Sequence, residues 1–262
     1  MKYSRVFINS LAYELAPQVV SSLDLESRLA PLYKKFRIPM GQLAALTGIT
    51  ERRWWPKGYR LSDGAIAAAT KAMNETGINV SDLGAVVYTG VCRDQHEPAT
   101  ACRIAAELGV SKDTAIYDIS NACLGVLSGI LDIANRIELG QIKAGMVVSC
   151  ESARDIVEAT IDHMLAEPTM QNFAQSLATL TGGSGAIAVI LTDGSLPLKN
   201  TRQHQLLGAS HLSAPEHHNL CEWGLQEAGH MLYREFMRTD AVTLLKEGVA
   251  MSFCSKAIAA GV

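Results

Sequence analysis

The stretch Tyr117–Gly125 (YDISNACLG) decides how the fold of this 262-residue chain is interpreted. It overlaps the apolar run Thr114–Ile119, which predicts a strand, and leads into Leu124–Leu139, whose apolar spacing predicts a helix. Cys123 therefore lies where a short turn passes from a strand to a helix. The first amides of a helix have no partner within it, and together with the helix dipole they favour a thiolate there. The same amides are able to hold the oxygen of an acyl group on the sulfur.

Two interpretations of Cys123 remain open on this local pattern: an acyl-accepting nucleophile, or a small buried cysteine at a helix start. None of the cysteines forms a C-x-x-C pair, so no metal site is predicted. Their spread is typical of reduced thiols in a cytoplasmic protein, and all except Cys123 are interpreted as small buried hydrophobes. The six cysteines are Cys92, Cys102, Cys123, Cys150, Cys221 and Cys254.

Apolar strands and helices alternate on both sides of this stretch. Further strands are predicted at Arg5–Asn9, Ala85–Val91, Gly145–Ser149 and Gly185–Leu191, and further helices at Leu25–Phe36, Ser62–Asn74 and Thr100–Leu108. Apolar strands that alternate with helices predict a sheet covered on both sides. Residues 1–195 are therefore interpreted as one α/β unit.

Residues 196–262 show a weaker pattern. Gln205–Leu212 is consistent with a strand, Ala214–Gly229 is polar and predicts a loop, and Thr239–Ala260 predicts a long helix. Since no strand follows that helix to cover its apolar face, we expect the second domain to be incomplete.

Composition excludes several classes of function. The net charge is −3 and the sequence has no basic run, so no nucleic-acid partner is predicted. The hydrophobic share is 48 %, but no window of about 18 apolar residues predicts a membrane span. The residues that follow Met1 do not form a secretory signal.

Glu97 is the second candidate site residue. It lies in Cys92–Ala99 (CRDQHEPA), directly after a predicted buried strand. Loops at the ends of such strands commonly carry sites, and a carboxylate there suits a general base. The alternative, a solvated loop glutamate before Pro98, stays open on the residues alone. His96 is interpreted as a surface histidine.

Two further motifs have structural alternatives. Gly182–Gly185 (GGSG) lacks the spacing of a dinucleotide loop, and we expect it to let the backbone pass close to another segment. Trp54 and Trp55 either line the mouth of a cofactor site or pack near a domain surface.

Four segments, in chain order, resemble ketoacyl-ACP synthase III enzymes of the thiolase superfamily. They are Leu46–Arg53 (LTGITERR), Ser62–Ala65 (SDGA), Asn121–Gly125 (NACLG) and Gly182–Ala186 (GGSGA). The resemblance implies a thiolase-like α/β fold with αβαβα layers. It further implies an N-terminal half at 1–195 that carries the nucleophile and a partial C-terminal half at 196–262.

Within that superfamily, Arg93–Thr100 (RDQHEPAT) resembles the R-D-x-x-E-P-S-T loop of OleA-type acyl-CoA condensing enzymes. The resemblance implies a non-decarboxylative Claisen condensation of two long-chain fatty acyl-CoA molecules to a 2-alkyl-3-oxo acid. It implies Cys123 as the nucleophile and Glu97, acting in the neighbouring subunit, as the base. The resemblance also implies a homodimer and a cytoplasmic location. It implies CoA thioesters as substrates without a cofactor, and downstream olefin-pathway enzymes as partners.

The resemblance also implies a histidine and an asparagine from the second half of the fold. None of the seven histidines follows a predicted buried strand in the required order, so we assign none to that role. We expect the chain to lack the C-terminal part of a family member. The aromatic residue and the arginine that precede the T-G-I segment in ketoacyl-ACP synthase III and help bind CoA are missing, since Leu46 stands directly before Thr47. The residues that contact CoA therefore stay unassigned.

Two other functions compete with acyl-CoA condensation. The first is a 3-oxoacyl-ACP synthase III that uses malonyl-ACP in fatty acid or polyketide synthesis and needs no carboxylate at Glu97. The second is a non-catalytic acyl-binding or partner subunit, which the unassigned histidine and asparagine favour.

Overall fold

The computed structural model describes residues 1–199, 203–227 and 233–260 of the chain. Its contacts divide the chain into two compact units that are interleaved along the sequence. Unit 1 comprises 1–16, 58–152 and 184–209, and unit 2 comprises 17–57, 153–183 and 210–262. The predicted division into thiolase-like halves at 1–195 and 196–262 is not the same as the division into these two units. It stays a prediction.

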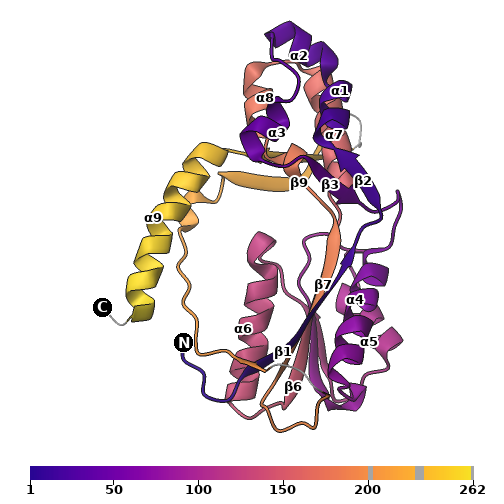
Figure 1. Ribbon diagram of the computed structural model, residues 1–262, viewed down its shortest axis with the longest axis vertical. Coiled ribbons are helices and arrows are strands. Elements are labelled where there is room, and N and C mark those ends of the chain that lie inside the picture. The colour runs from indigo at the N-terminus through magenta and orange to yellow at the C-terminus, as the bar shows by residue number, and fades with distance from the viewer. Residues whose placement is uncertain (200–202, 228–232, 261–262) are drawn as a thin grey trace. The chain divides into compact units, whose positions relative to one another are not determined.

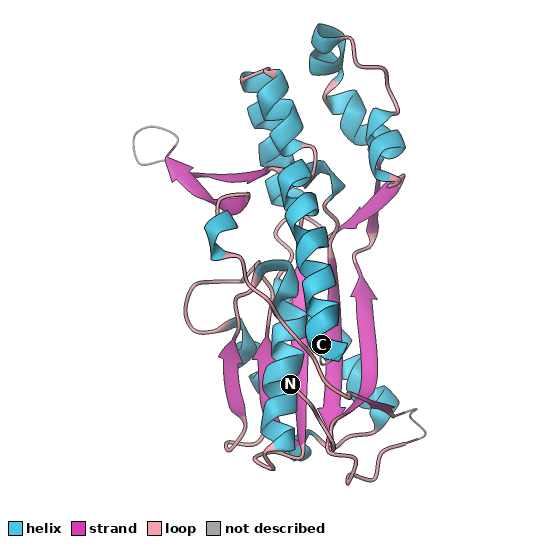
Figure 2. Ribbon diagram, turned by 90° about the vertical axis from the view of Figure 1, so that its left-hand side faces the viewer, coloured by secondary structure: helices cyan, strands magenta, loops and turns pink. Residues whose placement is uncertain are grey.

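Unit 1 is built on a six-stranded mixed sheet with the order β5-β4-β6-β7-β1-β8 (Figures 1 and 2). β4 pairs in parallel with β5 and β6, whereas β7 runs antiparallel to β6 and β1. The carboxyl ends of β4 and β5 therefore meet at the same edge of the sheet. The strands are β1 (Phe7–Leu15), β4 (Leu83–Tyr88), β5 (Ala115–Asp118), β6 (Ala144–Glu151), β7 (Gly185–Thr192) and β8 (His204–Gln205).

Helices cover both faces of this sheet. α4 (Leu61–Thr76) and α5 (Thr100–Leu108) lie on one face and α6 (Gly125–Glu138) on the other (Figure 1). Ile133 of α6 belongs to a buried cluster with the strand residues Val87 and Val147. The predicted α/β class, with a sheet covered on both sides, is confirmed.

Most predicted elements of unit 1 are present with shifted ends. The predicted strand Ala85–Val91 ends at Tyr88, because the chain then turns away from the sheet. The predicted strand Gln205–Leu212 is wrong apart from its first residue. In this part of the described chain, His204 and Gln205 pair with β1, and Gly208 forms an isolated bridge with Lys2.

Unit 2 combines short helices with two antiparallel strand pairs. β2 (Gln18–Ser21) pairs with β3 (Glu51–Trp54), and β9 (Cys221–Glu227) pairs with β10 (Tyr233–Thr239). Its helices are α1 (Ser22–Arg28), α2 (Ala30–Phe36), α3 (Gln42–Thr47), α7 (Arg154–Ala166), α8 (Met170–Ser176) and α9 (Ala241–Ala260).

The predicted helix Leu25–Phe36 is wrong as one element, since it forms α1 and α2. Pro31 lies in the first turn of α2, where its missing N–H costs no hydrogen bond. Glu26 of α1 is fully buried, and its carboxylate accepts hydrogen bonds from the backbone N–H groups of Gly41 (2.5 Å) and Leu43 (2.6 Å). This carboxylate therefore satisfies the start of α3.

The predicted loop Ala214–Gly229 is also wrong, because Cys221–Glu227 forms β9; residues 228–229 lie outside the described residues. The predicted helix Thr239–Ala260 is confirmed from Ala241 onward. The Asp240 carboxylate accepts a hydrogen bond from the backbone N–H of Thr243 at 3.1 Å and another from the Thr243 hydroxyl. These bonds lower the pKa of Asp240.

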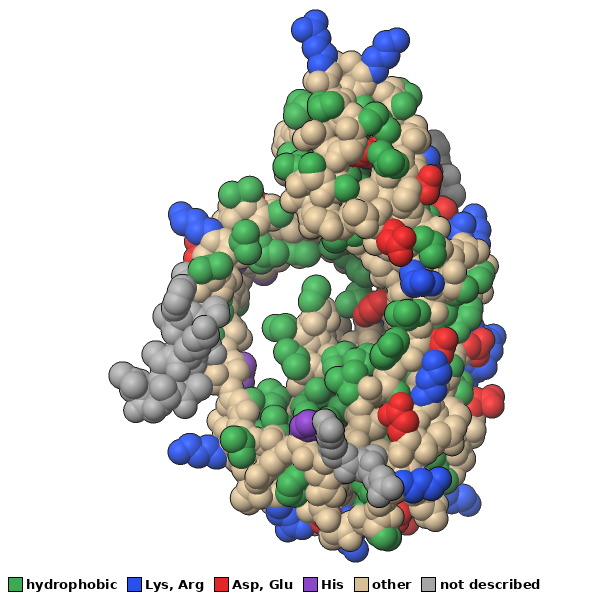
Figure 3. All heavy atoms as spheres, in the orientation of Figure 1, with side chains coloured by type: hydrophobic (Ala, Val, Ile, Leu, Met, Phe, Trp, Pro, Cys, Tyr) green, Lys and Arg blue, Asp and Glu red, His purple; other side chains and the backbone are tan. Residues whose placement is uncertain are grey.

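Two surface properties concern the predicted partners. In the described ranges, no helix has the length and apolarity needed to cross a bilayer. On the face shown in Figure 3, Lys and Arg side chains lie scattered among Asp and Glu, so the described residues gather no basic patch there.

Candidate active site

Cys123 lies on an exposed turn between β5 and α6. The turn contains a short 3-10 helix, Ala122–Leu124, in which the backbone N–H of Leu124 donates to the carbonyl oxygen of Asn121 at 2.9 Å. Ala122 has a φ of 44°, a left-handed conformation that costs free energy in a residue with a Cβ atom. Cys123 therefore lies two residues before α6 rather than inside it, and it is exposed.

Two glycines hold α6 close to the sheet. A Cβ atom on Gly125 would collide with the carbonyl oxygen of Thr89, which directly follows β4. A Cβ atom on Gly129, one turn later, would lie 2.8 Å from Thr89 Cγ2 and 2.9 Å from Val147 Cγ1. Because neither side chain is present, α6 packs directly on the strands, and the Cys123 turn is held at their carboxyl edge.

The loop that carries Glu97 leaves the same edge and is anchored at its beginning. The Glu151 carboxylate accepts from the backbone N–H groups of Val91 (2.6 Å) and Cys92 (3.2 Å). The Tyr88 hydroxyl lies 2.5 Å from the carbonyl oxygen of Cys92. Burial raises the pKa of Tyr88, so this hydroxyl keeps its proton.

Two aspartates hold the rest of this loop. The Asp94 carboxylate accepts from the backbone N–H groups of Leu61 (2.8 Å) and Ser62 (3.3 Å) at the start of α4. The Asp118 carboxylate, at the end of β5, accepts from the first two backbone N–H groups of α5. The sequence pattern did not single out these anchors, although Asp94 and Asp118 both lie within its quoted motifs.

Glu97 itself projects from the anchored loop. Gln95, His96, Glu97 and Pro98 are all exposed. Among the contacts of the described residues, none joins Glu97 to Cys123. The fold thus brings the turn with Cys123 and the loop with Glu97 to one edge of the sheet, and both side chains are accessible to solvent.

The remaining candidate motifs have structural roles. Trp54 and Trp55 are 3 % exposed, and the Trp54 indole N–H donates to the carbonyl oxygen of Gly182 at 3.4 Å. Both tryptophans are therefore part of the packed interior of unit 2. A Cβ atom on Gly182 would lie 2.9 Å from that of Ala153, so the expected close approach of the glycine segment is confirmed.

The other cysteines differ in exposure. Cys150 is buried, Cys92 and Cys102 are partly buried, and Cys221 is exposed. The expectation that every cysteine except Cys123 is buried is therefore wrong for Cys221. The side chain of Cys254 lies outside the described residues.

Unit 2 contains a pocket of about 490 Å³. That volume lies in the range of small-molecule sites. Its lining comes from the end of α3, from α8 and the segment after it, and from the start of α9. The lining residues are Thr47, Ala174, Gln175, Leu177, Ala178, Thr181, Thr239, Asp240, Ala241 and Val242.

Known proteins resemble this chain along almost its whole length, although no family model matches it. It is 88% identical over 252 residues to the acyl-CoA:acyl-CoA alkyltransferase of Shewanella oneidensis, covering 96% of this chain and 72% of that protein. The chain belongs to the acyl-CoA:acyl-CoA alkyltransferase family. The alkyltransferase of Xanthomonas campestris is 33% identical over 253 residues, covering 96% of this chain and 71% of that protein.

Solved structures of this family have the same fold. OleA of Xanthomonas campestris with bound lauric acid and lauroyl-CoA is 31% identical, with a TM-score of 0.87 over 99% of this chain and 74% of that one. The cerulenin-bound enzyme gives a TM-score of 0.86 at 31% identity, covering 100% and 74%. The predicted thiolase-like fold is therefore confirmed for this member of the alkyltransferase family.

Proposed function

We propose that this protein is an acyltransferase that condenses two long-chain fatty acyl-CoA molecules head to head to a 2-alkyl-3-oxo acid. The observation that carries the proposal is the identity of 88% with an acyl-CoA:acyl-CoA alkyltransferase. The geometry supports it, because an exposed cysteine follows a left-handed residue on a strand-to-helix turn.

The first step forms an acyl-enzyme. The thiolate of Cys123 attacks the thioester carbonyl carbon of one acyl-CoA, a new S–C bond forms, and the bond to the CoA sulfur breaks. CoA leaves as its thiol after taking up a proton. Exposure of Cys123 gives the acyl donor access to the sulfur.

The second step forms the carbon–carbon bond. The Glu97 carboxylate takes the α-proton of a second acyl-CoA, and the resulting carbanion attacks the Cys123 thioester carbonyl. The S–C bond to Cys123 then breaks and a 2-alkyl-3-oxoacyl-CoA is released. Water cleaves its remaining thioester to give the 2-alkyl-3-oxo acid and the second CoA. This scheme needs no cofactor beyond the CoA thioesters.

The pocket of unit 2 is our candidate for binding part of the acyl-CoA. Small apolar and hydroxyl side chains line most of it, which suits the uncharged, flexible arm between the nucleotide of CoA and its thioester. Thr47 contributes to this lining from the T-G-I segment, beside the positions that help bind CoA in ketoacyl-ACP synthase III.

A homodimer and a place in long-chain olefin synthesis belong to the same proposal. In the described residues, β5 is one of the two edge strands of its sheet, and an unpaired strand edge is suited to pairing with a second copy. Downstream olefin-pathway enzymes as partners and a cytoplasmic location stay predictions.

Mass measurement after incubation with myristoyl-CoA tests this function. We expect a mass increase of one myristoyl group, located on Cys123 by peptide mapping, and no increase in Cys123→Ala. Cys221→Ala removes another exposed thiol and serves as the matched control that keeps the adduct.

The other outcomes identify the competing functions. A protein that binds myristoyl-CoA without an adduct is a non-catalytic acyl-binding subunit. An acylated protein that consumes malonyl-ACP but no second acyl-CoA is a 3-oxoacyl-ACP synthase III.

A further inference from the structure

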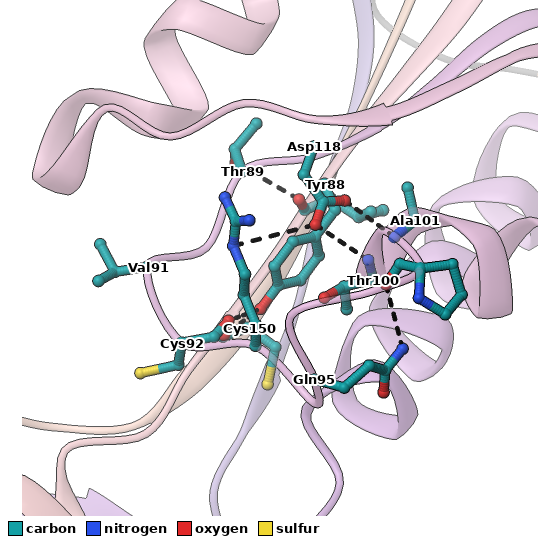
Figure 4. Close-up of polar contacts among 12 residues, drawn as sticks. Tyr88, Thr89, Val91, Cys92, Gln95, Thr100, Ala101, Asp118 and Cys150 are labelled. Atoms are coloured by element: carbon teal, nitrogen blue, oxygen red, sulfur yellow. Dashed lines mark hydrogen bonds and ion pairs between the residues drawn. The ribbon is translucent and has the colours of Figure 1, made fainter. Parts of the chain in front are cut away.

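The Asp118 carboxylate is held by several contacts near the candidate site. It accepts hydrogen bonds from the backbone N–H groups of Thr100 (2.9 Å) and Ala101 (3.0 Å), as Figure 4 shows. The Asp118 side chain is 6 % exposed, and Arg93 Nε lies 4.0 Å from one of its oxygens. A buried carboxylate on the first amides of a helix makes strong hydrogen bonds, because it interacts favourably with the helix dipole.

This contact joins the two segments that carry the candidate catalytic residues. Asp118 is the last residue of β5 and precedes Cys123 by five positions. Thr100 is the first residue of α5 and follows Glu97 by three positions. A single side chain therefore ties the strand of the nucleophile to the segment that carries the base.

The position of Glu97 depends on this tie. Asp94 fixes the loop on the N-terminal side of the exposed residues 95–98, and Asp118 fixes α5 on their C-terminal side. Glu97 is three residues from Thr100, at which α5 starts, and three residues from Asp94, whose contact is to a different helix. A shift in the start of α5 therefore displaces Glu97 directly.

We propose that Asp118 is a positioning residue for the base Glu97, holding it through the first amides of α5. This inference rests on the proposed function and deepens it. Asp118 acts on the second step, the removal of the α-proton, and not on acylation of Cys123.

Asp118→Asn tests the proposal with little change in shape. The asparagine amide presents its own N–H groups where one carboxylate oxygen now accepts, so at least one of the two bonds to α5 is lost. We expect condensation by the pre-acylated protein to slow by on the order of 10 to 100-fold, as for a misplaced catalytic group. We expect the rate of Cys123 acylation to change far less.

A double-mutant cycle with Glu97→Gln separates positioning from a general structural effect. If Asp118 acts through Glu97, then adding Asp118→Asn to Glu97→Gln produces no further loss of condensation rate. The proposal is overturned if the factors by which the two substitutions lower the condensation rate multiply in the double variant. It is also overturned if Asp118→Asn slows the acylation step alone.

Two further measurements complete the test. Asp113→Asn removes an exposed carboxylate at the other end of β5 and is the matched control, for which we expect unchanged condensation. Hydrogen exchange of the Thr100 and Ala101 amides should accelerate in Asp118→Asn and not in the control; unchanged exchange overturns the proposed tie. Unmodified protein without an acyl adduct overturns the proposed function and this inference together, whereas an adduct with multiplying losses overturns the inference alone.

Discussion

Individual side chains at the sheet edge divide into exposed reactive groups and the carboxylates that anchor them. Cys123 and Glu97 are exposed, whereas Asp94, Asp118 and Glu151 are partly buried, and these three accept backbone hydrogen bonds. Motif patterns identified the exposed pair because chemistry restricts their residue types and spacing. The anchors were missed, because their backbone partners lie 17 to 60 residues away along the chain.

Glu97→Gln should separate the two steps of the reaction. Glutamine keeps the size of the side chain but has no carboxylate to take a proton. We expect Cys123 acylation to persist and condensation to fall by about 100-fold or more, the usual contribution of a general base. Acylated protein chased with a second acyl-CoA, with the 2-alkyl-3-oxo product measured by mass spectrometry, gives both rates.

His96→Gln is the control for that experiment, since His96 is an exposed neighbour in the same loop. We expect both steps to proceed at the rates of the unmodified protein. A Glu97→Gln variant that condenses as fast as this control would remove Glu97 from the mechanism.

Among the elements, α5 has the predicted bounds Thr100–Leu108, and the prediction for α6 is nearly as close. The expected limits, Leu124–Leu139, differ by one residue at each end from Gly125–Glu138, because the apolar period of a helix is a local property of the sequence. β9 was missed because it lies within a stretch, Ala214–Gly229, that is polar as a whole, and because its partner β10 lies outside that stretch. The sequence likewise did not show that Gly125 and Gly129 are needed for close packing, since that depends on which residues lie opposite them.

Gly129→Ala should destabilise the protein, although alanine is the better helix former. The new methyl group would lie within 3 Å of Thr89 and Val147, so α6 or the strands must move. We expect a loss of about 1 to 3 kcal/mol in the free energy of unfolding, as for overpacked cores, measured by urea denaturation.

Gly248→Ala in α9 is the matched comparison. A Cβ atom at Gly248 meets no atom within 4 Å, so only the helix propensity changes. We expect it to raise the free energy of unfolding by about 0.5 to 1 kcal/mol. Equal effects of the two substitutions would contradict the close packing of α6.

At the level of the molecule, the proposed dimer makes Glu97 part of another chain's site. The unpaired outer edge of β5 leads directly to the Cys123 turn, so pairing of two copies there would bring the second chain close to that turn. We expect a mass in solution of twice the chain mass of 28.1 kDa.

Mixing two inactive variants tests whether Glu97 acts across the dimer. Cys123→Ala and Glu97→Gln chains that exchange subunits form mixed dimers, each with one intact cysteine opposite one intact glutamate. Random exchange then restores about a quarter of the active sites if the base acts in the partner. No recovery after confirmed exchange would place Glu97 in its own subunit's site.

Sequence patterns were sufficient for the α/β class, for the order of most strands and helices of unit 1 and for the choice of Cys123 and Glu97 as candidate site residues. Periodicity and motif spacing are properties of short stretches, so they can be recognised without any knowledge of the fold. Only the folded chain shows the backbone hydrogen bonds of Asp94, Asp118 and Glu151. It alone also shows that the two units are interleaved along the sequence. Each of these features depends on which distant segments pack together. The total apolar surface buried in the core determines that packing, and no short stretch of sequence does.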